Sequence, residues 1–341
     1  MDEPRPTRSL YLGAAGMILA LDRLAEADLH APRRDWTGVA RGLHAGYVDA
    51  PDEGDPAPSL LIGASGILLT SWLLSADPEA ADLLADAVAA NIGNETNELL
   101  WGSPGTMIAA SVMLDRSGEA RWAELWRASA RQLLDVQDPD GLWTQRMYGR
   151  VTRYVGAGHG FAGNVHALSL RPELLDDADA VFQQAVATAA AHAVRRAGQA
   201  NWPGLAGTDL GLHGRTQWCH GAPGIITSLA RLEPEDSGLT TLLEDAGELV
   251  WRAGPLVKGP GLCHGTAGNG FAFLALLRRT GEERWLERAR AFAMHAAAQV
   301  DAARSDHSRG RYTLWTGDIG AAIFLARCLR GDAGFPTLDA W

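Results

Sequence analysis

The sequence predicts an all-α fold, a double-layered α/α barrel (toroid) of seven helical hairpins with Gly-x-x-Gly turns. A Gly-x-x-Gly pair followed by an apolar stretch recurs seven times in the 341 residues, with first glycines 39 to 61 residues apart. Amphipathic stretches lie between the apolar ones. The repeat extends to both ends of the chain, which favours closure into a ring over an open solenoid with polar end caps. The pairs are Gly13/Gly16, Gly63/Gly66, Gly102/Gly105, Gly160/Gly163, Gly221/Gly224, Gly265/Gly268 and Gly317/Gly320.

The apolar stretch after each glycine pair predicts an inner helix. Residues 66–74, GILLTSWLL, are hydrophobic nearly all round, as expected for a buried helix. Residues 119–134 and 282–300 carry charges on one face at helical spacing, and these predict outer helices with one solvent-exposed side. The glycines allow tight turns where the inner helices begin. We expect a single domain over residues 1–341.

Composition restricts the classes of function. The formal charge is −11 and no block rich in Lys or Arg occurs, which argues against a nucleic-acid partner. No apolar run reaches the roughly 18 to 20 residues of a membrane-spanning helix. The first residues lack the pattern of a secretory signal, so we expect a cytoplasmic protein. Three cysteines form no disulfide framework and fit better as reduced ligands.

Aligning the units on their first glycine identifies candidate chemistry in the two preceding positions. In the fifth and sixth units these positions are Cys219-His220 and Cys263-His264, and in the fourth unit they end in His159. Residues at equivalent offsets meet near the axis if rotation relates the units. We therefore expect Cys219, Cys263 and His264 to converge at one mouth of the ring. His159 should lie beside them.

Two thiolates and an imidazole form a good ligand set for one zinc ion. Three protein ligands leave the fourth position open, as in catalytic sites, and structural sites more often show Cys-x-x-Cys pairs. Helix N-termini should gather at the same mouth, where their free N–H groups would favour thiolates. The alternative is that these cysteines and histidines only pack in the core, as we expect for Cys328, which lies in an apolar helix.

Three segments resemble the lanthionine synthetase C-like (LanC-like) family. Residues 217–224, QWCHGAPG, and 261–269, GLCHGTAGN, are similar to its two zinc motifs, and residues 156–164, GAGHGFAGN, are similar to a third. The resemblance extends over all seven glycine pairs. It implies a sevenfold α/α barrel whose members add a thiol to the β-carbon of dehydroalanine or dehydrobutyrine. Bacterial members close thioether rings in peptides, whereas eukaryotic-type relatives use glutathione.

The resemblance also implies roles for individual residues. Cys219, Cys263 and His264 would hold zinc, and His159 matches a histidine proposed as the acid/base. Glu98 occupies the place of a carboxylate that acts in some members. The alternative for this residue is a solvated loop glutamate.

Lys258 matches a lysine that glutathione-type relatives use to bind substrate, and a plain surface role is the alternative. Residues 102–106, GSPGT, lack the Arg and Tyr that such relatives often carry, which weakens a claim on glutathione. We expect no fused dehydratase, so a peptide substrate should arrive already dehydrated.

Three hypotheses remain open. The first is a zinc-dependent cyclase that forms (methyl)lanthionine rings in a ribosomally made, dehydrated peptide, with a dehydratase as possible partner. The second is intermolecular addition of glutathione or another small thiol to dehydroamino acids. The third is a non-catalytic module that binds zinc and thiols. A carbohydrate enzyme on an α/α barrel ranks last, because it needs two carboxylates where this mouth carries thiols and imidazoles.

Overall fold

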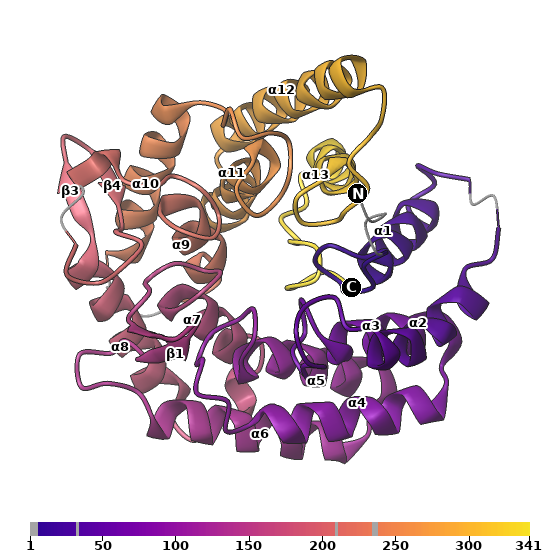
Figure 1. Cartoon of the computed structure of the whole chain (residues 1–341). Helices are drawn as coiled ribbons and strands as arrows, with labels where there is room; N and C mark the ends of the chain where they lie inside the picture. The colour runs from indigo at the N-terminus through magenta and orange to yellow at the C-terminus, as the bar shows by residue number, and fades with distance from the viewer. Residues whose placement is uncertain (1–5, 32–33, 209–210, 234–237) are drawn as a thin grey trace.

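The computed structural model describes residues 6–31, 34–208, 211–233 and 238–341, and these residues form a ring of helices in two layers (Figure 1). Within them, seven helices form the inner layer and six the outer layer. The inner helices are α1 (Ala14–Glu26), α3 (Ala64–Ser75), α5 (Ser103–Ser117), α7 (Phe161–Ser169), α9 (Ala222–Leu229), α11 (Thr266–Thr280) and α13 (Asp318–Arg330). The outer helices are α2 (Thr37–Asp49), α4 (Pro78–Asn91), α6 (Ala120–Asp135), α8 (Ala178–His192), α10 (Leu239–Ala253) and α12 (Glu283–His307).

The glycine pairs set how closely neighbouring units pack. A Cβ on the second glycine of any pair would lie 1.8 to 2.4 Å from the carbonyl oxygen six residues earlier, which no side chain tolerates. The same face meets the adjacent unit, since a Cβ on Gly66 would lie 2.8 Å from Leu10 Cβ. Gly16 faces Leu314 in the same way, 2.9 Å from its Cβ. The first and last units therefore pack like any other neighbours, and α1 contacts α13.

The outer helices are amphipathic as the sequence predicts. On α6 the side chains of Trp122, Trp126, Ala130 and Leu133 are buried, and their spacing of three or four residues places them on one face. The double-layered α/α barrel is confirmed. In the described part of the chain, the seventh unit consists of α13 with no outer helix after it.

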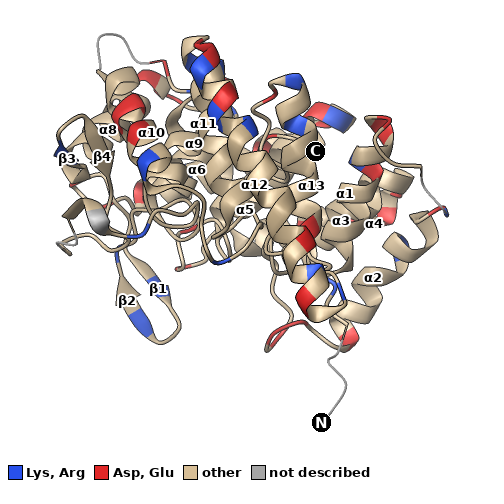
Figure 2. Cartoon of the chain, turned by 90° about the horizontal axis from the view of Figure 1, so that it is seen from above, with Lys and Arg blue, Asp and Glu red and all other residues tan. Residues whose placement is uncertain are grey.

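Short elements not predicted from the sequence interrupt the helical repeat. One antiparallel hairpin, β1 (Gln145–Met147) with β2 (Arg150–Thr152), lies between α6 and α7. It projects beyond the helices with a basic residue on each strand (Figure 2). The remaining elements are a second hairpin, β3 (Val194–Arg196) with β4 (Gln199–Asn201), and two 3₁₀ turns, η1 (Pro172–Leu174) and η2 (Gly211–His213).

The last residues of the chain lie inside the ring (Figure 1). Ala333, Phe335 and Leu338 are buried there. The main-chain carbonyl of Trp341 accepts hydrogen bonds from an arginine of α1 and an arginine of α5. The segment therefore fills the centre of the ring from within. Among the described residues, no helix is both long and apolar enough to cross a lipid bilayer.

Candidate metal centre

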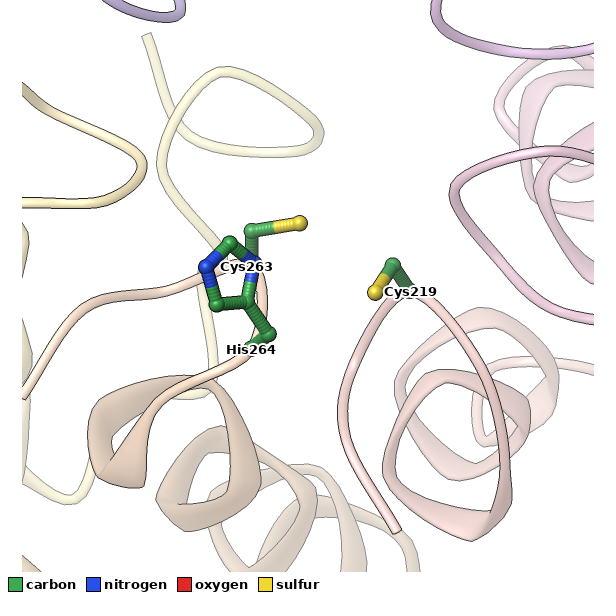
Figure 3. Close-up of side chains that lie close together, drawn as sticks. All are labelled: Cys219, Cys263 and His264. Carbon is green, nitrogen blue, oxygen red and sulfur yellow. The ribbon is translucent and has the colours of Figure 1, made fainter. Parts of the chain in front are cut away.

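Three side chains from two units converge at the mouth of the ring. Cys219 ends the loop before α9, and Cys263 and His264 end the loop before α11 (Figure 3). Their possible ligand atoms all lie within 4.8 Å of one another. Both cysteines are buried, His264 is half-buried, and the main-chain N–H of Cys219 donates to the carbonyl of Cys263 at 3.1 Å. The predicted convergence is therefore present in the structure, and this group can hold a metal ion.

The two thiols differ in acidity. The neighbouring Cys263 thiol lowers the pKa of Cys219 to about 4 against the opposing effect of burial. The proximity of Cys219, together with burial, raises the pKa of Cys263. Gln217 Nε2 donates a hydrogen bond to Cys219 Sγ at 3.1 Å. One sulfur is thus ready to bind a cation at neutral pH, and metal coordination would ionise the other.

A histidine and a glutamate form the second part of the site. His159 Nδ1 lies 3.0 Å from Glu98 Oε2. Glu98 is 0% exposed, and its carboxylate accepts hydrogen bonds from the main-chain N–H groups of Leu100 at 2.9 Å and Trp101 at 2.6 Å. Burial lowers the pKa of His159, but the hydrogen bond and charge of Glu98 outweigh it, so the net pKa is raised. Glu98 is no solvated loop residue; it orients His159 and stabilises its protonated form.

These two parts of the site are in direct contact. The main-chain N–H of Gly158 donates to the carbonyl of Cys219 at 3.3 Å. A Cβ on Gly158 would lie 3.0 Å from Cys219 Cβ, so a larger residue would push the two loops apart by a few tenths of an ångström. His159 therefore follows a residue packed on a candidate ligand.

Lys258 is exposed at the edge of the site. Its Nζ donates to Gln217 Oε1 at 3.3 Å, and Gln217 in turn donates to Cys219. Lys258 is thus two hydrogen bonds from a candidate metal ligand and remains open to solvent. This placement suits a group that contacts a bound substrate.

Sequence reasoning missed several residues that surround the centre. The rings of Tyr154 and His159 each lie close to that of His220, at 5.5 and 5.8 Å between centroids, and burial lowers the pKa of His220 to about 4. Burial, together with the neighbouring Cys263, raises the pKa of Tyr11, which places its hydroxyl beside this candidate ligand. Tyr11 precedes its glycine pair by two residues, the offset of both cysteines, so the repeat contained a signal for it. Gln217 begins one of the family motifs but was given no role, and no signal marked Tyr154.

The helix N-termini at the mouth offer fewer free N–H groups than the sequence analysis expected. In the first unit, the N–H groups of Ala14 and Ala15 donate to carbonyls in residues 7–8. In the fourth, Phe161 and Ala162 donate to carbonyls in residues 154–155. The loop before each of these inner helices satisfies donors that would otherwise face the mouth, so the thiols depend more on each other and on nearby side chains.

Comparison with known protein families shows to which family the chain belongs. The family described as lanthionine synthetase C-like protein matches residues 6–339. The chain belongs to this family. Among relatives of the LanC-like chain, glutathione S-transferase LANCL1 of Danio rerio is 34% identical over 199 residues, 54% of this chain and 46% of that protein. LanC-like protein GCL1 of Arabidopsis thaliana is 34% identical over 178 residues, 50% of this chain and 39% of that protein.

The matched segment thus spans less than half the length of either relative. A solved structure of nisin cyclase is also similar, with a TM-score of 0.65 and 17% sequence identity, covering 94% of this chain and 88% of that one. At this identity the likeness establishes the shared α/α toroid.

Proposed function

We propose that this LanC-like chain is a zinc enzyme that adds a thiol to the β-carbon of dehydroalanine or dehydrobutyrine. Its proposed substrate is a ribosomally made, dehydrated peptide, in which it closes (methyl)lanthionine rings. One observation carries the proposal: the ligand atoms of Cys219, Cys263 and His264 lie within 4.8 Å of one another, next to the loop that bears His159, which pairs with Glu98. Membership of the lanthionine synthetase C-like family supports it.

The donor set fits zinc. Cys219, Cys263 and His264 supply two sulfurs and one imidazole nitrogen, which zinc prefers over the oxygen ligands that suit magnesium or calcium. Three protein ligands leave a fourth position for a substrate atom. When bound, zinc makes a substrate thiol available as a thiolate at neutral pH.

His159 performs the proton transfers in this proposal. It accepts the proton of the incoming thiol, and the adjacent Glu98 carboxylate stabilises the resulting imidazolium. The sulfur forms a bond to the β-carbon of the dehydroamino acid, and the π electrons of the alkene move toward the α-carbon and its carbonyl. His159 then returns the proton to the α-carbon. Every atom of both reactants is retained, so no oxidant or leaving group is needed.

A second candidate function is intermolecular addition of glutathione or a related small thiol. The exposed Lys258, two hydrogen bonds from Cys219, offers a cation for a carboxylate of such a thiol. A relative named glutathione S-transferase points in the same direction.

Mass spectrometry separates these functions. A dehydrated peptide that contains cysteine is incubated with the zinc-loaded protein and glutathione, and free thiols are then alkylated. Ring closure leaves the mass unchanged and removes the alkylation site, whereas glutathione addition raises the mass. A His159→Asn variant is the control. If zinc is bound but neither product forms, the enzyme proposal is wrong and a non-catalytic zinc- and thiol-binding module takes its place.

The proposed chemistry also requires a reducing environment, in which the cysteine thiols stay free. All three cysteines are free in the structure, and two of them must remain reduced to bind zinc. We therefore place the protein in the cytoplasm, where it receives peptides that a dehydratase has already modified.

A further inference from the structure

The seventh unit contacts both metal-binding loops without supplying a ligand. It carries Trp315 at the offset where the fifth and sixth units carry cysteine. The carbonyl of Trp315 accepts hydrogen bonds from the main-chain N–H groups of Leu262 at 2.8 Å and Cys263 at 2.9 Å. Its ring lies 4.7 Å from that of Trp218, the residue before Cys219. Trp315 therefore holds the Cys263 loop through its backbone and the Cys219 loop through its ring.

Residues 331–341, here called the C-terminal segment, support Trp315 from inside the ring. The Phe335 ring lies 5.5 Å from that of Trp315 and 5.4 Å from that of Trp218. Thr337 Oγ1 accepts a hydrogen bond from Trp315 Nε1 at 3.1 Å. All four side chains are buried. The C-terminal segment thus touches both tryptophans that pack beside the ligand-bearing loops.

Arginines at the far ends of the inner helices anchor the C-terminal segment. The Asp339 side chain is only 6% exposed, and it pairs with Arg231 at 3.2 Å and Arg278 at 3.7 Å. Its carboxylate also accepts a hydrogen bond from the main-chain N–H of Phe335. The carbonyl of Trp341 accepts hydrogen bonds at 3.3 and 3.1 Å. The donors to Trp341 are Arg23 and Arg116.

We propose that Phe335 and Thr337 are positioning residues for the metal centre. By fixing the rings of Trp218 and Trp315, they fix the loops that carry Cys219 and Cys263. This inference rests on the zinc function proposed above, and it assigns the C-terminal segment a part in that function. Residues behind the ligands of a zinc site typically change metal affinity by about 10- to 100-fold when replaced, because they hold the ligands in place before binding.

The chain offers a matched control for Phe335. Phe324 is equally buried, and its ring packs on Phe271 at 5.1 Å, as that of Phe335 does at 4.6 Å. Among the described aromatic contacts, Phe324 touches neither Trp218 nor Trp315. Phe335→Leu and Phe324→Leu therefore remove similar amounts of core packing and differ in what they do to the two loops.

Thr337 allows a second test that leaves the core intact. Its backbone is left-handed, with φ of 64°, and both threonine and valine are β-branched, so Thr337→Val removes the hydroxyl without changing the shape or adding backbone strain. Thr337→Ser keeps the acceptor for Trp315 Nε1.

Zinc affinity, measured by competition with a chromophoric chelator, is the primary readout, and the cobalt(II) absorption spectrum reports ligand geometry. We expect Phe335→Leu to weaken zinc binding by about 10-fold or more and to alter the cobalt spectrum, while Phe324→Leu changes affinity by less than about 3-fold at a similar loss of melting temperature. Thr337→Val should weaken zinc binding, whereas Thr337→Ser should bind zinc about as tightly as the unmodified protein.

Equal affinities for the two phenylalanine variants, or for the two threonine variants, would overturn the inference. Failure of the proposed function looks different, because the unmodified protein would then bind no zinc, or would bind zinc and form neither product.

Discussion

The two Cys-His-Gly triplets of this chain have the same sequence and the same place in the repeat, yet they contribute different side chains to the candidate metal centre. In residues 263–265 both Cys263 and His264 belong to the candidate metal-ligand group. In residues 219–221 only the cysteine does. The ring of His220 instead lies among the other aromatic side chains of the site. The centre is therefore asymmetric although the units that build it repeat.

Backbone hydrogen bonds around each triplet explain the difference. Gln217 and His220 exchange two main-chain hydrogen bonds of 3.1 Å, which close a tight turn, and Gly221 has φ of 110°, a conformation that favours glycine. Around the other triplet, Cys263 donates to the carbonyl of Trp315, and Gly265 is extended. The residues that contact a triplet, more than the sequence of the triplet itself, decide how its imidazole is oriented.

Replacing the two histidines one at a time tests this difference between the triplets, and it should give the largest effect on zinc binding. We expect His264→Ala to lower zinc affinity by more than about 100-fold, beyond the effect of residues outside the ligand set, because one of three protein ligands is lost. We expect His220→Ala to retain about one zinc per chain. Metal analysis after dialysis measures both. Cys263→Ala serves as the positive control and should lose its zinc.

Replacing His159 separates the chemistry of the site from its metal. His159→Asn should reduce turnover by about 10²- to 10⁴-fold, the usual contribution of a general acid/base, with zinc content unchanged. Single-turnover assays with a dehydrated peptide give the rate. Retention of full activity would exclude His159 as the proton donor and shift attention to His220.

The Glu98–His159 pair predicts the direction in which the pKa of His159 changes when Glu98 is replaced. Burial alone lowers the pKa of His159, and Glu98 reverses this, so Glu98→Gln should bring the pKa from above its ordinary value of about 6.5 to below it. An NMR titration of the histidine rings measures this, with the solvent-exposed His307 as internal reference.

The same pair should make the stability of the folded protein depend on pH. Because folding raises the pKa of His159, the pair stabilises the protein fully below about pH 6.5 and loses this effect as the pH rises through the folded-state pKa. The difference in melting temperature between the unmodified protein and Glu98→Gln should therefore be largest in acid. A difference that grows toward alkaline pH would have the wrong sign.

The smallest expected effect concerns Lys258. Because it is exposed, its attraction for a substrate carboxylate is screened by water, and Lys258→Ala should raise the KM for glutathione by no more than about 5-fold. Lys258→Arg should retain most of the binding. No change in KM for glutathione would leave Lys258 with a surface role only.

Much of the fold follows from the sequence because the glycine period is a steric requirement of every unit. The same period predicts that Cys219, Cys263 and His264 meet at one mouth, and their possible ligand atoms do lie close together in the structure. Among the described residues, the hairpins occur only in the connections before α7 and α9, and the C-terminal segment occurs once, so the sevenfold period carried no information about them. The burial of Glu98 depends on main-chain donors at Leu100 and Trp101, which residue types do not reveal.

The repeat alone does not distinguish the roles of His220 and His264. Both follow a cysteine and precede a glycine, and only the resemblance to the family motifs selects His264 as a ligand. The distinction arises from φ at Gly221 and from the carbonyl of Trp315, which are features of the folded backbone. A repeat can predict where residues meet, whereas contacts between units decide what each of them does.

X-ray absorption at the zinc edge tests the asymmetric centre most directly. For the unmodified, zinc-loaded protein we predict two sulfur ligands at about 2.3 Å and one imidazole nitrogen at about 2.0 to 2.1 Å, with a third sulfur added when a thiol substrate binds. Two imidazole ligands, a single sulfur, or the absence of zinc would contradict the account.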